Sequence, residues 1–114
     1  MATIYKICTA EEWHRAMAAG SFAGSAADLR DGFIHFSTGE QARATAARHF
    51  AGRDNLVIVA FDDTALGPKL RYEPSRGGAL FPHLYEALDP QAAIWAEPLP
   101  LHADGTHIFP ERID

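Results

Sequence analysis

A histidine in the stretch 31–41, DGFIHFSTGEQ, is the first candidate for chemistry. His35 and Ser37 lie on one face of the strand predicted here, because strand side chains alternate between faces. The apolar neighbours should leave the imidazole at least half buried, and a buried polar group needs a hydrogen-bond partner. His35 is therefore either a structural histidine or a group that faces a ligand pocket. Ser37 also has a structural explanation, because Ser37 or Thr38 can cap the helix that follows.

A second histidine lies in the stretch 80–88, LFPHLYEAL. Phe81, His83 and Tyr85 share one face of the predicted strand, which follows a glycine-bearing loop whose only charge is Arg76. The aromatic rings could stack on a flat ligand, and the guanidinium could hold a phosphate. Taken singly, the aromatic residues are explained as core and Arg76 as a solvated loop charge. A shared pocket with the first histidine is the prediction that favours a binding site.

Strands and helices that position these residues follow from periodicity and capping signals. The sequence predicts helices within 9–20 and 37–52 and a Gly/Ser/Ala-rich loop over 20–31, with strands at 3–8, 33–37, 55–63, 70–73, 80–87 and 92–99. The apolar run 55–63, NLVIVAFDD, is typical of the middle strand of a sheet. Pro82 has no N–H to donate, which predicts an edge strand or a bulge at that point.

Composition bounds the class of protein. The 114 residues, 47% of them hydrophobic, predict a single domain over 1–114. A formal charge of −5 has the wrong sign for a protein that neutralises phosphates, so nucleic acid is not an expected partner. The lone Cys8 forms no internal disulfide, and no apolar run predicts a signal peptide or a membrane span. We expect a cytoplasmic protein with Cys8 in its core.

Motifs for several chemistries are missing from the sequence. It contains no glycine-rich phosphate loop, dinucleotide fingerprint, paired-cysteine zinc pattern, HExxH or nucleophile elbow. His35, His83 and a carboxylate could assemble a metal site, but their spacing does not support one. The prediction is therefore no metal.

Four stretches of the chain resemble a bacterial protein family. IYKI followed by EEW, DGFIHFST.EQ, RHFAG, and LRYEPSRGGALFPHLYEAL occur in the order found in the domain of unknown function 952, over roughly residues 4–95. That family is uncharacterised biochemically and is grouped by remote similarity with the ADP-ribosyltransferase fold. The resemblance implies an α+β fold with a small split mixed or antiparallel β-sheet and two main helices. It also implies NAD as a candidate cofactor, in a cleft between the sheet halves.

The resemblance to ADP-ribosyltransferases also implies roles for particular residues. In such enzymes an early-strand polar residue holds the nicotinamide ribose, a strand-to-helix unit shapes the pocket, and a late-strand glutamate orients the acceptor. FIHFS is similar to the middle unit, and Glu73 and Glu86 are the catalytic candidates for the glutamate. The early-strand position falls near Tyr5 or Lys6, where the usual histidine is missing, so His35 could replace it only from a different strand.

Three hypotheses for function remain open. The first is an ADP-ribosyltransferase-like enzyme, or a remnant of one, that breaks the nicotinamide glycosidic bond of NAD or acts on a related nucleotide. The second is a non-catalytic module that binds a small molecule, and the third is a protein-contact domain without a ligand site. A carboxylate of Glu73 or Glu86 within hydrogen-bonding reach of the histidine pocket would favour catalysis over binding alone. The sequence leaves the oligomeric state open, and a monomer is compatible with it.

Overall fold

The structure, a computed structural model, describes residues 2–113, and the side chain of Arg76 lies outside that description. Its main elements are β1 Thr3–Thr9, α1 Ala10–Ala19, α2 Ala26–Asp31, β2 Ile34–His35, β3 Ser37–Thr38, α3 Gly39–His49, β4 Leu56–Asp62, β5 Leu70–Pro74, β6 Leu80–Leu84 and β7 Trp95–Pro98. Short 3-10 turns lie at Asp63–Leu66, Arg76–Gly78 and Pro90–Ala92. The α+β class and the two main helices, α1 and α3, are therefore confirmed.

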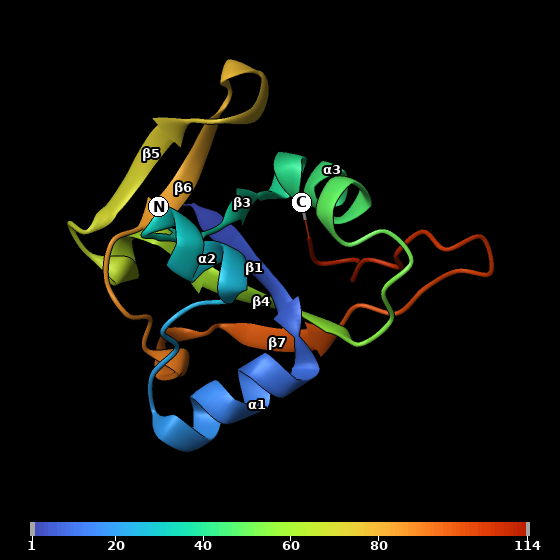
Figure 1. Ribbon diagram of the computed structural model, residues 1–114, viewed down its shortest axis with the longest axis horizontal. Helices are drawn as coiled ribbons and strands as arrows, with labels where there is room; N and C mark the ends of the chain where they lie inside the picture. The colour runs from blue at the N-terminus through green and yellow to red at the C-terminus, as the bar shows by residue number, and fades with distance from the viewer. Residues whose placement is uncertain (1, 114) are drawn as a thin grey trace.

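The described strands form two antiparallel sheets. One sheet has the order β3-β1-β4-β7, and the other has the order β2-β6-β5. The β5–β6 hairpin projects away from the larger sheet, as Figure 1 shows at the upper left. The prediction that 55–63 forms a middle strand is confirmed, because β4 lies between β1 and β7.

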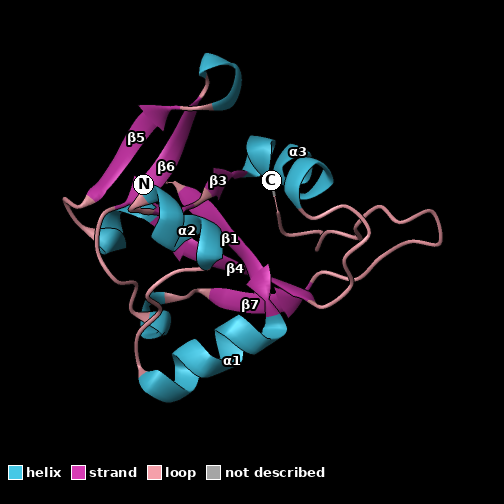
Figure 2. Cartoon of the chain, in the orientation of Figure 1, coloured by secondary structure: helices cyan, strands magenta, loops and turns pink. Residues whose placement is uncertain are grey.

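Helices cover both faces of the larger sheet. On one face Trp13 and Ala16 of α1 pack in a cluster with Phe61, and on the other Ala42 and Ala46 of α3 pack in a second cluster. Since both faces are covered, β1 and β4 are buried along nearly their whole length. Figure 2 shows the longer irregular segment of the chain beyond β7. None of the helices in the described range has the length and apolar character needed to cross a bilayer.

The strand predicted at 33–37 is divided between the two sheets. β2 pairs with β6 and β3 pairs with β1, with Phe36 as the residue between them. The N–H of Phe36 donates to the carbonyl of Pro82 at 3.0 Å, but proline has no N–H to return, so this ladder ends. The prediction of one regular strand, with His35 and Ser37 on a common face, is wrong for this reason.

Pro82 lies in the middle strand of its sheet, not at an edge as predicted. Its carbonyl points toward β2, so its missing N–H falls on the same side, where the ladder already stops. The β5–β6 ladder therefore loses no hydrogen bond at the Tyr72–Pro82 pair.

The segment 20–31 is not wholly a loop, because it contains the short helix α2. Ser25 and Asp28 form a reciprocal capping box at its start, and Gly32 ends it in the left-handed region at φ 87°. The Gly, Ser and Ala content of the segment predicted a loop, although the Ser-x-x-Asp spacing of a capping box was present at Ser25 and Asp28.

The smaller sheet depends on Leu84 to join the core. Leu84 is 2% exposed, whereas Leu80 of the same strand is 52% exposed. We expect Leu84→Ala to lower the free energy of unfolding by about 2–5 kcal/mol, because it removes buried methyl groups and leaves a cavity. Leu80→Ala is the matched control, and urea unfolding of both variants is the measurement. Equal losses would contradict this account of the sheet.

Candidate functional site

One face of the smaller sheet packs on the core and the other carries polar and aromatic groups. Ile34, Leu70 and Leu84 turn to the core cluster. Strand alternation and register then bring a second set of side chains onto the opposite face. We call this set the histidine face: Phe33, His35, Arg71, Glu73, Phe81, His83 and Tyr85.

The two strand histidines are direct cross-strand partners. His35 pairs with His83, and their ring centroids are 5.7 Å apart in an edge-to-face arrangement. Phe33 stacks on His83, with centroids 4.0 Å apart and an interplanar angle of 26°, and lies 5.3 Å from the Tyr85 ring. The structure thus brings together four residues that the sequence proposed as ligand-binding: His35, Phe81, His83 and Tyr85.

Glu73 holds His83 through its imidazole. Oε1 of Glu73 lies 2.8 Å from Nδ1 of His83 and accepts the hydroxyl of Tyr85 at 2.6 Å. The hydrogen bonds from Tyr85 and His83 lower the pKa of the Glu73 carboxyl, and Glu73 raises the pKa of Tyr85. An ionised carboxylate only accepts, so Nδ1 of His83 carries a proton and neutral His83 has its lone pair on Nε2.

His35 is bound on both ring nitrogens. Nδ1 lies 2.6 Å from Oδ1 of Asp28, and Nε2 lies 2.9 Å from Oδ2 of Asp31. The Arg30 hydrogen bond lowers the pKa of Asp31, so both carboxylates are acceptors at neutral pH. Both ring nitrogens of His35 are therefore occupied by carboxylate oxygens of α2.

A buried ion pair fixes His35. Lys6 and Asp28 have side chains that are 4% and 2% exposed, with Nζ 2.8 Å from Oδ2. Asp28 also accepts the backbone N–H of His35, and Lys6 donates to its carbonyl at 3.0 Å. Burial by itself would raise the pKa of Asp28, but the hydrogen bond from His35 and the charge of Lys6 outweigh it and hold that pKa well below the usual range.

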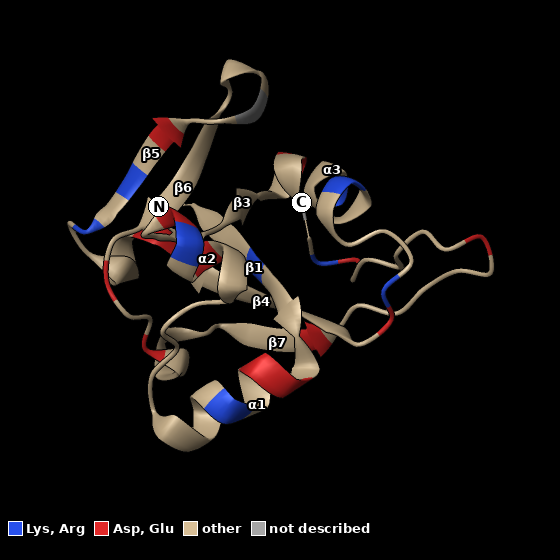
Figure 3. Cartoon of the chain, viewed as in Figure 1, with Lys and Arg blue, Asp and Glu red and all other residues tan. Residues whose placement is uncertain are grey.

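Lys6, Asp28 and Asp31 are members of the site that the sequence pattern did not predict. One signal for them was a lysine inside the apolar strand TIYKIC, because a strand buried on both faces leaves a charge in need of a partner. The charged residues of α2 and β5 have both signs, as Figure 3 shows.

Other proposed residues lie in different positions. The hydroxyl of Ser37 contacts that of Thr45 on α3 at 2.8 Å, away from the histidines. Of Arg76, only the backbone is described. Glu86 is exposed and lines a small cavity of about 240 Å³ beside Phe33 and Tyr85.

Cys8 lies in the core as expected. Its side chain is buried, and burial raises the pKa of its thiol to about 12. The thiolate needed for nucleophilic chemistry is therefore scarce at neutral pH. Within residues 2–113, no group of three or more His, Cys, Asp and Glu side chains is arranged to hold a metal ion.

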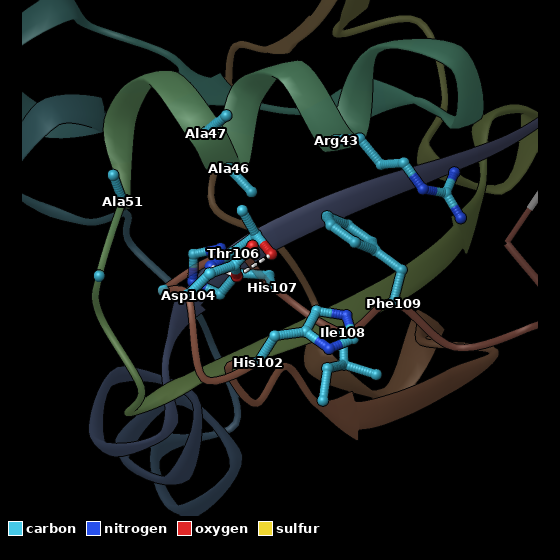
Figure 4. Close-up of a pocket in the computed structure, with 12 residues that line it drawn as sticks. Arg43, Ala46, Ala47, Ala51, His102, Asp104, Thr106, His107, Ile108 and Phe109 are labelled. Atoms are coloured by element: carbon cyan, nitrogen blue, oxygen red, sulfur yellow. Dashed lines mark hydrogen bonds between the residues drawn. The ribbon is translucent and has the colours of Figure 1, made fainter.

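A larger cavity lies on another side of the molecule. It measures about 870 Å³ between α3 and the segment 102–109 (Figure 4). Arg43 stacks over Phe109 at 5.0 Å, and His107 lies 2.8 Å from the carbonyl of Arg53 through Nε2. Within the described residues, His107 binds a backbone carbonyl here, whereas both histidines of the histidine face bind carboxylates, so the histidine face is the better candidate for acid–base chemistry.

Residues 7–96 match the model of a family described as a protein of unknown function (DUF952). The chain belongs to the DUF952 family. This range includes Asp28, His35, Glu73 and His83.

Solved structures similar to this DUF952 chain come from protein CC0527 of Caulobacter crescentus. The crystal structure has 50% identity and a TM-score of 0.91, with 94% of each chain covered. The solution NMR structure has 52% identity and a TM-score of 0.84, covering 93% of this chain and 91% of that one. No curated protein matches the sequence.

The buried ion pair predicts strong coupling between its two residues. We expect Lys6→Met and Asp28→Asn each to lower the free energy of unfolding by about 3–5 kcal/mol, because each leaves a buried group without its partner. The double variant should lose less than the sum of the two. Urea unfolding tests this, with Arg15→Met as a control that breaks an exposed ion pair with Glu11. Strictly additive losses would contradict the coupling.

Acid should weaken the fold through Asp28. Because its pKa is lower in the folded than in the unfolded chain, its stabilising effect is complete above the unfolded pKa of about 3.9 and falls as the pH drops below it. The melting temperature of the wild type should therefore fall more steeply below about pH 4 than that of Asp28→Asn. Parallel curves of melting temperature against pH would exclude this role.

Proposed function

We propose that the histidine face binds NAD or a related nucleotide and that this DUF952 protein is an ADP-ribosyltransferase-like enzyme. The observation that carries the proposal is the cross-strand pair of His35 and His83, each bound to a carboxylate, on a face lined by aromatic rings. Contacting imidazoles and carboxylates are the groups from which acid–base sites are built.

The division of the sheet supports an ADP-ribosyltransferase-like arrangement. The chain passes from the smaller to the larger sheet between His35 and Ser37, and the helix α3 follows directly. Lys6, near the expected early-strand position, contacts the backbone of His35. His35 therefore lies beside that position in space although it comes from a different strand.

The groups on the histidine face suit the parts of a nucleotide. Phe33 and Tyr85 offer rings for stacking on nicotinamide or adenine. The guanidinium of Arg71 lies 5.5 Å from the Tyr85 ring and suits a phosphate. Nε2 of His35 is bound to Asp31, which is 36% exposed, and a ligand oxygen could replace that carboxylate.

Glu73 favours an enzyme over a binding module. Its carboxylate lies within hydrogen-bonding distance of His83, which is the contact expected of a catalytic site. A non-catalytic small-molecule module remains the second candidate, because the stacked rings alone suffice for binding. Release of nicotinamide from NAD separates the two.

We also propose that the protein acts in the cytoplasm of a bacterium. An acidic chain of net charge −5 with one buried cysteine suits a cytoplasmic bacterial protein that binds a small molecule as a monomer and does not bind nucleic acid.

Ligand-dependent stability tests the proposal. A ligand at ten times its Kd should stabilise the fold by about 1.4 kcal/mol, which for a domain of this size raises Tm by about 5 °C. We expect this shift with millimolar NAD or ADP-ribose in the wild type and in His14→Ala, whose histidine is exposed on α1. His35→Ala should lose most of it.

Two outcomes would count against this assignment. The absence of any shift with NAD, ADP-ribose and nicotinamide would reject the nucleotide site. A shift of the same size in folded His35→Ala would place the site elsewhere on the molecule.

A further inference from the structure

We infer that Nε2 of His83 is the base that deprotonates the acceptor, and that the acceptor is water or an alcohol. This inference rests on the proposed function and adds the class of the second substrate. The two paired histidines differ in how many of their ring nitrogens are bound to carboxylates.

Glu73 is already engaged through one oxygen. Its Oε1 accepts both the Nδ1 proton of His83 and the hydroxyl of Tyr85, at 2.8 Å and 2.6 Å. A carboxylate that accepts two such bonds is a weak base toward a third group. Its effect is to orient the imidazole of His83 and to stabilise the imidazolium that forms when His83 takes a proton.

Nε2 of His83 is available to a substrate. The His83 side chain is only 5% exposed, and no contact of Nε2 with another described residue is found. Every fully buried side-chain nitrogen or oxygen among residues 2–113 has a hydrogen-bond partner. Because Nε2 of His83 has none among these residues, it belongs to the small exposed part of the ring. The stacked Phe33 restricts the ring, which leaves a lone pair in a fixed direction.

His35 cannot take this role. Both of its ring nitrogens are bound to carboxylates of α2, so neither is open to a substrate. The polar groups around His83 are the imidazole of His35, the carboxylate of Glu73 and the guanidinium of Arg71 on its opposite strand. Of the two paired histidines, His83 is the one that combines a nitrogen held by a carboxylate with a second nitrogen open to a ligand.

The chemical step balances with NAD and a hydroxyl compound. The acceptor O–H bond breaks and its proton goes to Nε2 of His83, while the oxygen forms a bond to C1′ of the ribose. The bond from C1′ to the nicotinamide nitrogen breaks, and its electron pair neutralises the pyridinium. The products are free nicotinamide and either ADP-ribose or its O-alkyl glycoside at C1′, with one proton left on His83.

Nicotinamide release from NAD, followed by chromatography in water and in water with methanol, tests the inference on the full chain. Wild type should form methyl ADP-ribose when methanol is present. His83→Gln should bind NAD within about threefold of wild type but release nicotinamide at least about 100-fold more slowly. Imidazole should restore part of the release in His83→Ala, which a purely structural role of His83 would not allow.

Glu73→Gln provides a second variant, because the Glu73 side chain is 32% exposed and tolerates substitution better than buried His83. It should lower kcat about tenfold with little change in the Kd for NAD. His14→Ala should match the wild type in both assays.

The outcomes separate the inference from the proposed function. Wild type that does not bind NAD overturns both. Wild type that binds NAD without releasing nicotinamide overturns the base assignment and leaves a binding module. Normal release in folded His83→Gln, or no imidazole effect in folded His83→Ala, overturns the assignment of His83 alone.

Discussion

The buried ion pair between Lys6 and Asp28 is the contact on which the site depends. Lys6 belongs to the larger sheet, Asp28 to α2, and both bind His35 of the smaller sheet. Two charges removed from water destabilise a fold unless their hydrogen-bonding capacity is filled. Here the ammonium has three acceptor atoms and the carboxylate binds the ammonium, the imidazole and two backbone N–H groups. His35 is therefore held at its ring and at its backbone.

The break at Phe36 gives the site its shape. Because proline returns no hydrogen bond, the chain crosses to β1 after two residues of pairing. As a result His35 pairs with His83 in the smaller sheet, and Ser37, two residues later, contacts Thr45 from the larger sheet. The missing N–H of Pro82 thus lies where the chain passes from the histidine face, with His35, to the larger sheet, with the buried Ser37.

The two histidines differ because their neighbours differ. His35 lies between carboxylates on both nitrogens, whereas His83 has a carboxylate on one nitrogen and solvent on the other. Their ring centroids are only 5.7 Å apart, so a fully bound and a partly open imidazole lie side by side. This asymmetry follows from the placement of α2, which covers His35 but does not contact Nε2 of His83.

The sequence by itself determined the regular elements and several members of the site. Alternation in TIYKIC, the apolar run of β4 and the cap at Thr9 are local signals, and the corresponding elements formed as expected. Two histidines in aromatic strands could be selected in the same way. Only the tertiary structure decided that the two histidines pair, that Lys6 and Asp28 bind His35, and that Ser37 contacts Thr45 instead of the histidines. The His35–His83 pairing depends on strand register, and the Lys6–Asp28 ion pair joins residues 22 positions apart; hydrophobic periodicity contains no information on either.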